Sequence, residues 1–152
     1  MRYIKFLWIF GIVSLTSCHK DAFEPYDQPF VHIMKNGLSA VSVSARGTSV
    51  ETYSVYLSSK ALTENLTVDF GIITGEGLVA GADFELLTTG NQLVFPPGIY
   101  EMPVRIRWVK NPVDESEDNT LKIVLLGNSM GFTLGLPGPD GKQKEFVITK
   151  VN

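Results

Sequence analysis

The sequence predicts an all-β fold in which seven or eight short antiparallel strands form a single two-sheet sandwich. Three observations support this prediction. Apolar and polar residues alternate along several segments, clusters of glycine, proline and asparagine separate these segments, and no stretch carries a helical apolar stripe over three turns. A chain of 152 residues with this pattern has room for one such domain, which we expect at 30–152.

Eight segments carry the alternating pattern. The longer ones are 52–58, 65–72, 100–108, 120–125 and 144–149, and the shorter ones are 31–34, 41–45 and 93–95. Residues of one parity in a strand share one face, so Val104, Ile106 and Trp108 should enter the core while Arg105 and Arg107 face outward. Pro103 cannot donate to a strand ladder, so we expect it on an edge or at a bulge.

The first 17 residues have the order of a secretory signal peptide. Arg2 and Lys5 precede an unbroken apolar run at 6–13, and small and polar residues then lead to Cys18. The apolar run is far shorter than the roughly 20 residues of a transmembrane helix, which favours a cleaved signal over a permanent span.

Cys18 is the predicted lipidation residue. Leu15-Thr16-Ser17-Cys18 resembles the bacterial lipobox, in which the cysteine is diacylated and becomes the first residue of the mature protein. The alternative is an incidental cysteine near the cleavage point, but Cys18 is the only cysteine and has no intramolecular disulfide partner. Residues 18–29 contain two prolines and no periodic pattern, so they read as a flexible tether between a membrane and the domain.

The residues after Cys18 also suggest a destination. Lys20-Asp21 resembles the export signal of lipoproteins from the Bacteroides group, which implies an outer-membrane lipoprotein exposed on the cell surface; a periplasm-facing anchor is the alternative. Loss of residues 1–17 would leave 11 basic and 16 acidic residues, a formal charge of −5. This balance argues against nucleic acid or an anionic lipid surface as a partner, because both require a basic patch.

The middle of the chain resembles a known domain family. Ala80-Gly81-Ala82-Asp83-Phe84 precedes the strand and turn of 92–98, and the alternating segment 102–108, the acidic stretch 114–118 and the strand 121–125 follow. This order resembles the Calx-beta repeat over residues 49–151. The resemblance implies an immunoglobulin-like sandwich with calcium sites at one end.

A second resemblance concerns the C-terminal part. The glycine- and proline-rich stretch 131–141 and the strand 146–149 look like small surface lipoproteins of the Bacteroides group. Such proteins often accompany outer-membrane machinery for glycan capture and uptake, which implies a non-enzymatic binding or accessory component. The alternative is a structural or adhesion module that docks to a neighbouring outer-membrane protein.

The acidic turn is the only candidate metal site. It offers Asp114, Glu115, Glu117 and Asp118, and calcium prefers several oxygen ligands. The family's sites also use acidic residues at the start and end of the domain, whereas this chain has Lys35 and Asn36 at its start and ends in Lys150-Val151-Asn152. With half the ligand shell missing, we expect a solvated acidic hairpin that binds calcium weakly or not at all.

Aromatic residues are the candidate ligand contacts, because flat rings can cover the apolar face of a sugar. Trp108 shares a face with Val104 and Ile106 and should lie in the core, so Tyr56 and Tyr100 are the better candidates. Asp83 and Phe84 match the family's Asp-aromatic pair, for which we expect a structural role: Asp83 bonds local amides and Phe84 enters the core.

No catalytic set is recognisable in the sequence. His19 falls in the tether, His32 is the only histidine of the domain, and no serine or cysteine nucleophile has a recognisable elbow. The glycine clusters do not lead into a helix with a lysine, as a phosphate-binding loop requires. We therefore expect neither an enzyme nor a cofactor.

Overall fold

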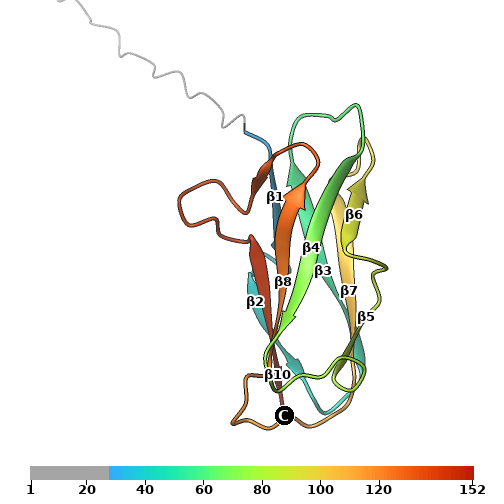
Figure 1. The fold of residues 1–152 in the computed structure, drawn as a ribbon, viewed down its shortest axis with the longest axis vertical. Helices are drawn as coiled ribbons and strands as arrows, with labels where there is room; N and C mark the ends of the chain where they lie inside the picture. Colours follow the sequence, from blue (N-terminus) through green and yellow to red (C-terminus); the bar gives the residue numbers. More distant parts are fainter. Residues whose placement is uncertain (1–27) are drawn as a thin grey trace, which may run out of the picture.

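The computed structural model describes residues 28–152, and every regular element in this range is a β-strand (Figure 1). The predicted signal peptide, Cys18 and nearly all of the predicted tether lie outside the described residues. None of the described residues forms a helix with the length and apolar character needed to cross a membrane.

The described chain contains ten strands. They are β1 (Phe30–Met34), β2 (Ala40–Ser44), β3 (Ser49–Ser58), β4 (Leu66–Thr74), β5 (Phe84–Leu86), β6 (Gln92–Phe95), β7 (Glu101–Trp108), β8 (Thr120–Asn128), β9 (Thr133–Leu134) and β10 (Glu145–Val151). The prediction of seven or eight strands omitted β5 and β9, because segments of three and two residues are too short to display an alternating pattern.

The strands form two five-stranded sheets. The first sheet has the order β5-β7-β3-β1-β9 and the second has the order β2-β10-β8-β4-β6 (Figure 1). Most neighbours are antiparallel, as predicted, but β9 pairs with β1 and β2 pairs with β10 in parallel. The all-antiparallel prediction is therefore wrong at these two pairs. Between β1 and β2 the chain passes from the first sheet to the second through a tight turn, in which Asn36 and Gly37 have positive φ.

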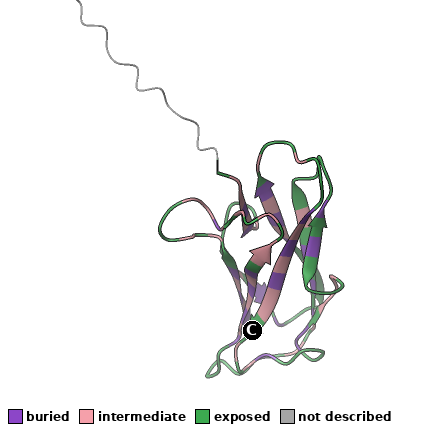
Figure 2. Cartoon of the chain, turned by 45° about the horizontal axis from the view of Figure 1, so that its top comes forward, coloured by how far each residue is buried: buried purple, intermediate pink, exposed green. Residues whose placement is uncertain are grey.

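Both sheets bury one face in a shared apolar core, so the fold is a two-layer β-sandwich. The alternation of buried and exposed positions is visible along the strands in Figure 2. Trp108 and Tyr53 of the first sheet are fully buried, and the Trp108 Nε1–H donates to the Tyr53 hydroxyl at 3.1 Å. The ring centroid of Tyr53 lies 5.1 Å from that of Phe146 in the second sheet. The predicted core positions Val104, Ile106 and Trp108 are confirmed.

Pro103 lies at an edge, as predicted. β5 pairs with β7 only at Trp108, Arg107 and Ile106, so β7 has no strand partner on this side at Pro103. On the other side, Ser54 of β3 lies opposite Pro103 in the β3–β7 register. The missing N–H of Pro103 therefore breaks no ladder bond, because it points to the open side of the strand.

The molecule is elongated along its strands. β1 begins at one end, the C-terminus lies at the opposite end, and a loop projects sideways between β9 and β10 (Figure 1). We call residues 136–142 the side loop. Its base is closed by a hydrogen bond from the Leu136 amide to the Lys142 carbonyl at 2.6 Å. Gly135 has φ of +88°, and a Cβ at this position would lie 2.5 Å from the Gly141 carbonyl oxygen, so the closed base requires glycine.

Candidate functional site

Three ring side chains form a row on the outer face of the first sheet. Phe30 and His32 have the same parity in β1, and Tyr56 of β3 lies directly opposite His32 in the register. The ring centroids are 5.5 Å apart for Phe30 and His32 and 5.6 Å apart for His32 and Tyr56. All three residues are half-buried. We call these three residues the aromatic row. Their flat rings lie on the sheet and are partly accessible to solvent.

Polar groups surround the aromatic row. His32 Nδ1 lies 2.7 Å from Oε1 of Gln143, which follows the side loop. A carbonyl oxygen can only accept, so this bond assigns the hydrogen to Nδ1 and fixes the plane of the imidazole. The Ile33 amide donates to the Gln143 carbonyl at 2.9 Å and holds Gln143 beside β1. Glu101 of β7 lies opposite Tyr56, so a carboxylate also borders the row.

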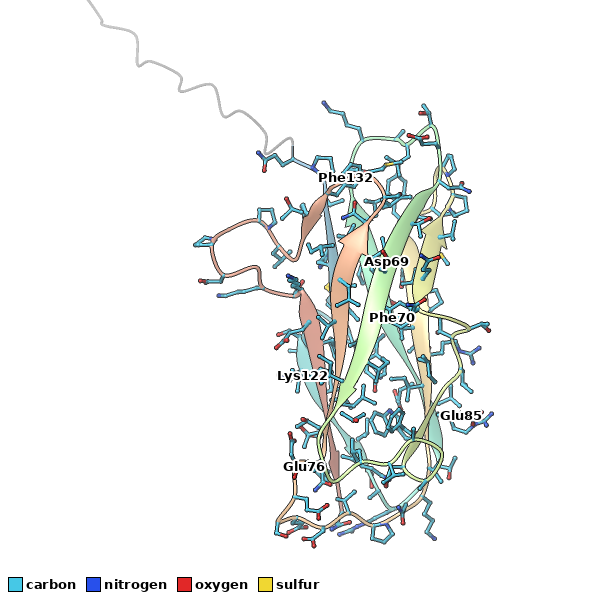
Figure 3. The ribbon with its side chains drawn as sticks, in the orientation of Figure 1. Asp69, Phe70, Glu76, Glu85, Lys122 and Phe132 are labelled. Carbon is cyan, nitrogen blue, oxygen red and sulfur yellow. The ribbon has the colours of Figure 1, made fainter. Side chains whose placement is uncertain are left out.

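A hollow continues from the aromatic row toward the end of the molecule at which β1 begins. Its volume is about 420 Å³, and Ser58, Ser59 and Phe132 are among the lining residues. Ser58 lies opposite Phe30 in the β1–β3 register, so the hollow and the row are contiguous. Figure 3 shows Phe132 at this end of the molecule. The combined surface offers rings together with hydroxyl, amide and carboxylate groups.

The structure does not bring together the two predicted ligand contacts. Tyr56 belongs to the aromatic row, whereas Tyr100 precedes β7 and its carbonyl accepts from the Leu57 amide at 2.9 Å. Tyr100 is 39% exposed. It directly precedes Glu101, whose side chain borders the row, so the Tyr100 side chain is directed away from the face that carries the row. Phe30 and His32 were not predicted as contact residues, although the alternating Phe30-Val31-His32-Ile33 places their two side chains on one face.

A second concavity lies beside the side loop. Its volume is about 710 Å³, with Ala40 of β2, Val124 of β8 and Val147 of β10 on the sheet side and charged residues such as Lys142 and Glu145 around it. It is larger than the hollow beside the aromatic row, but none of its lining residues carries an aromatic ring. The two sites therefore differ in chemistry, and only the row combines rings with hydrogen-bonding groups.

The predicted acidic turn is held by its own hydrogen bonds. Asp114 Oδ1 accepts from the Ser116 amide at 2.9 Å and from the Ser116 hydroxyl at 2.6 Å, and these bonds lower the pKa of the Asp114 carboxyl. Asp118 Oδ1 accepts from the amide and hydroxyl of Thr120 in the same way. Within residues 28–152, no group of three or more His, Cys, Asp or Glu side chains is arranged to hold a metal ion. The expectation of weak or no calcium binding stays a prediction.

Asp83 and Phe84 have the structural roles that the sequence predicted. Phe84 is buried in the core, and the Val79 amide donates to Asp83 Oδ2 at 2.9 Å. The main partner of Asp83 is Lys150 of β10, which was not predicted. Lys150 Nζ lies 2.7 Å from Asp83 Oδ1. Burial by itself would raise the pKa of Asp83, but hydrogen bonds from Lys150, Val79 and Asn111 hold it below its ordinary value.

Of the two outward arginines of β7, Arg107 forms an ion pair and Arg105 forms a hydrogen bond through its main chain. Arg107 Nη1 lies 2.5 Å from Glu85 Oε2 of the neighbouring β5, and both side chains are about half exposed. The Arg105 amide donates to the hydroxyl of Thr88, which lies in the loop after β5, at 2.8 Å. Both residues face outward, as predicted.

Comparison with known proteins gives no family assignment. No protein-family model matches this chain, and no curated protein matches it.

Proposed function

We propose that this protein is a non-enzymatic surface lipoprotein that binds a carbohydrate on the aromatic row. The observation that carries the proposal is the contiguous arrangement of Phe30, His32 and Tyr56 beside a hollow of about 420 Å³. Rings cover the apolar face of a sugar, and neighbouring hydroxyl, amide and carboxylate groups bond its hydroxyls. Few polar groups placed around a mainly apolar surface are typical of small-molecule sites.

The geometry around His32 favours binding over catalysis. Its Nδ1 hydrogen is engaged by a side-chain amide oxygen, whereas a histidine general base is usually oriented by a carboxylate. The aromatic row also lies on a sheet, which holds contact residues rigidly in place.

The proposed setting rests on the N-terminal sequence. The signal-like residues 1–17, the lipobox ending at Cys18 and the Lys20-Asp21 pair support an outer-membrane lipoprotein with the domain on the cell surface. We further infer that the sandwich belongs to the immunoglobulin-like, Calx-beta-like class. The division of the first two strands between the two sheets and the order of the segments from Asp83 to β8 support this inference. An association with glycan uptake machinery follows from the resemblance to Bacteroides-group lipoproteins.

A protein-docking function is the second candidate. Exposed aliphatic side chains lie on the outer face of the second sheet, where Ile73, Val94 and Leu126 are 55%, 43% and 60% exposed. These side chains follow three adjacent strands, β6, β4 and β8, and exposed apolar surface is a common feature of interaction sites. This face would suit a neighbouring outer-membrane protein better than a sugar, because it carries no ring.

Affinity electrophoresis through gels containing single polysaccharides tests the carbohydrate proposal. We expect at least one polysaccharide to retard the wild-type protein and to retard the Tyr56→Ala variant much less. Thr52→Ala is the matched control, because Thr52 is exposed on the same strand and face outside the row. A protein that no polysaccharide retards would leave the docking function as the better proposal.

A further inference from the structure

Lys150 is a buried amine that no part of the proposed function uses. It follows Phe146 and Ile148 on the inward side of β10, and its side chain is 0% exposed. Lys150 Nζ lies 2.7 Å from Asp83 Oδ1, and the Asp83 side chain is 5% exposed. A buried charge is usually paired in this way. A lysine amine withdrawn from water is also a common nucleophile in proteins, so the surroundings of Nζ decide what it can do.

The same carboxylate oxygen also binds a side-chain amide. Asn111 Nδ2 donates to Asp83 Oδ1 at 2.9 Å, so the lysine amine and the asparagine amide meet at one oxygen atom. The Val109 amide donates to the Asp83 carbonyl at 3.0 Å and holds Asp83 beside the segment that leads from β7 to Asn111. The Val79 amide donates to the second carboxylate oxygen at 2.9 Å. An amine, an amide and an acid that contacts both are therefore held together out of water.

We propose that the side chains of Lys150 and Asn111 join in an amide bond, with Asp83 as the proton carrier. A bond forms between Lys150 Nζ and Asn111 Cγ, and the bond between Asn111 Cγ and Nδ2 breaks. The nitrogen of Asn111 leaves as ammonium. The step needs no oxidant and no second reactant. Its product ties β10 of the second sheet to the segment after β7 of the first sheet.

The protons of this step balance within the three side chains. Lys150 Nζ starts with three protons, because the amine is ionised beside Asp83. One proton stays on the new amide nitrogen, and two pass through Asp83 Oδ1 to the leaving nitrogen. Asp83 is therefore ionised before and after the reaction. Its Oδ1 suits this transfer because it contacts both nitrogens in the structure.

The site favours the reaction by position and limits its rate by charge. Reactants that are held side by side need no collision, which is among the largest gains in intramolecular reactions. The attacking group is the neutral amine, which arises when a proton moves from Nζ to Asp83. The pKa of Asp83 lies below its ordinary value, so this neutral pair is a minor form. Newly folded protein therefore carries the ion pair, and the amide bond accumulates slowly afterwards.

The bond would give this chain a covalent link between its sheets that cysteine cannot provide. The only cysteine is Cys18, which lies outside the described residues, so no intramolecular disulfide is possible. A bond between residues 111 and 150 closes a long loop, and such links stabilise a fold by restricting the unfolded chain. The cross-linked protein should therefore unfold at a higher temperature than the newly folded protein.

Peptide mapping of the full-length protein over time tests the proposal. Trypsin cleaves after unmodified lysine and arginine, so the unlinked chain yields peptides 111–122 and 145–150. The cross-linked chain should yield 111–122 joined to 145–152, with a mass lower than their sum by one ammonia, because trypsin does not cleave after a lysine amide. We expect this species to accumulate over several days at growth temperature. The midpoint of thermal unfolding should rise in parallel.

Variants of the two joined residues separate the bond from the ion pair. Asn111→Ser removes the reacting amide, and Lys150→Arg keeps the charge but removes the amine. Neither variant should form the joined peptide or gain stability with time. Each is compared with its own fresh sample, so a lower starting stability does not affect the result. Asn36→Ser is the matched control, because the exposed Asn36-Gly37 pair can also lose ammonia by closing on its own main chain; this variant should cross-link as the wild type does.

Four results would overturn the proposal. The first is a wild-type protein that still yields only the unlinked peptides after the incubation. The second is a joined peptide from the Asn111→Ser chain, and the third is a link from Lys150 to Asp83 with loss of water instead of ammonia. The last is an equal rise of the unfolding midpoint in the wild type and Asn111→Ser, which would mean that the bond is not the source of the added stability.

Discussion

The most consequential single contact in the domain is the ion pair between Lys150 and Asp83. Both residues are almost completely inaccessible, at 1% and 3% exposure, and Asp83 also accepts from Asn111 at 2.9 Å. Two buried charges stabilise a fold little in net terms, because each loses its hydration. Removal of one partner is costly, however, since the other charge then remains buried without compensation.

Lys150→Met should therefore destabilise the domain strongly. We expect a loss of about 3–5 kcal/mol in the free energy of unfolding, as is typical when one partner of a buried ion pair is removed. Chemical denaturation monitored by Trp108 fluorescence measures it. Lys122→Met is the matched control, because Lys122 pairs with Glu145 at 3.7 Å and both side chains are about half exposed. It should cost less than about 1 kcal/mol. Equal losses in the two variants would contradict this account.

The same contact predicts a pH dependence. The pKa of Asp83 lies below its ordinary value of 3.8 in the folded protein, so ionised Asp83 contributes stability that is fully present above pH 3.8. That contribution is lost as the pH falls through the lower, folded-state pKa. Thermal unfolding midpoints measured from pH 7 down to pH 2 should therefore fall in this acid range. The Asp83→Asn variant should start lower and show a smaller decrease, whereas a parallel decrease in both proteins would exclude Asp83 as the source.

At the scale of elements, the turn after β4 packs closely against the start of β8. A Cβ at Gly75 would lie 2.2 Å from the Asp118 carbonyl oxygen, and one at Gly77 would lie 2.2 Å from Asn119 Oδ1. The Gly75 amide also donates to the Thr120 carbonyl at 2.7 Å. The two segments fit together only because neither glycine has a side chain.

Gly75→Ala should consequently lower the midpoint of thermal unfolding. The added methyl group meets main-chain atoms that cannot rotate away, so we expect a loss of about 1–3 kcal/mol, as for overpacked sites in general. Gly47→Ala is the control, because a Cβ at Gly47 has no atom within 4 Å and this glycine has no positive φ. That variant should be neutral or more stable by up to about 1 kcal/mol. A Gly75→Ala protein as stable as the Gly47→Ala protein would refute the tight packing.

Alternation in the sequence was enough to predict the core-facing side of β7 and the outward side that carries Arg105 and Arg107. It also contained a signal for the ion pair, because Phe146, Ile148 and Lys150 share the inward parity of β10. The partner was not predictable, since Asp83 is 67 residues away and local pattern does not specify such a pairing. The parallel pairs β1–β9 and β2–β10 were not predicted for the same reason, because each joins segments far apart in the sequence. Of the candidate site, Tyr56 was predicted, but its neighbours on β1 depend on the β1–β3 register.

At the scale of the whole molecule, the two ends of the sandwich differ. The aromatic row and its hollow lie toward the end at which β1 begins, whereas the acidic turn lies near the C-terminal end, where Asn152 bonds the main chain of Val113. If Cys18 carries the lipid, residues 18–29 can extend to roughly 40 Å at about 3.4 Å per residue. The tether would then hold the row within that distance of the membrane.

The proposed lipid anchor makes a prediction about the whole protein. If Cys18 is acylated as we propose, Cys18→Ala should release the protein from the membrane fraction, because the acyl chains would supply the membrane affinity. Fractionation and immunoblotting of cells that express each protein measure this release. The Ser17→Ala chain keeps a small residue before Cys18 and should remain in the membrane fraction. Membrane retention of the Cys18→Ala protein would show that another segment provides the attachment.

The proposed function depends on carbohydrate binding by the aromatic row. Calorimetric titration with the polysaccharide that retards the wild-type protein, performed on the wild type, Tyr56→Ala and Tyr100→Ala, is the decisive measurement. We expect Tyr56→Ala to weaken binding by about tenfold or more, equivalent to about 1.4 kcal/mol, and Tyr100→Ala, outside the row, to bind as the wild type does. Wild-type affinity in Tyr56→Ala, or a loss confined to Tyr100→Ala, would contradict it.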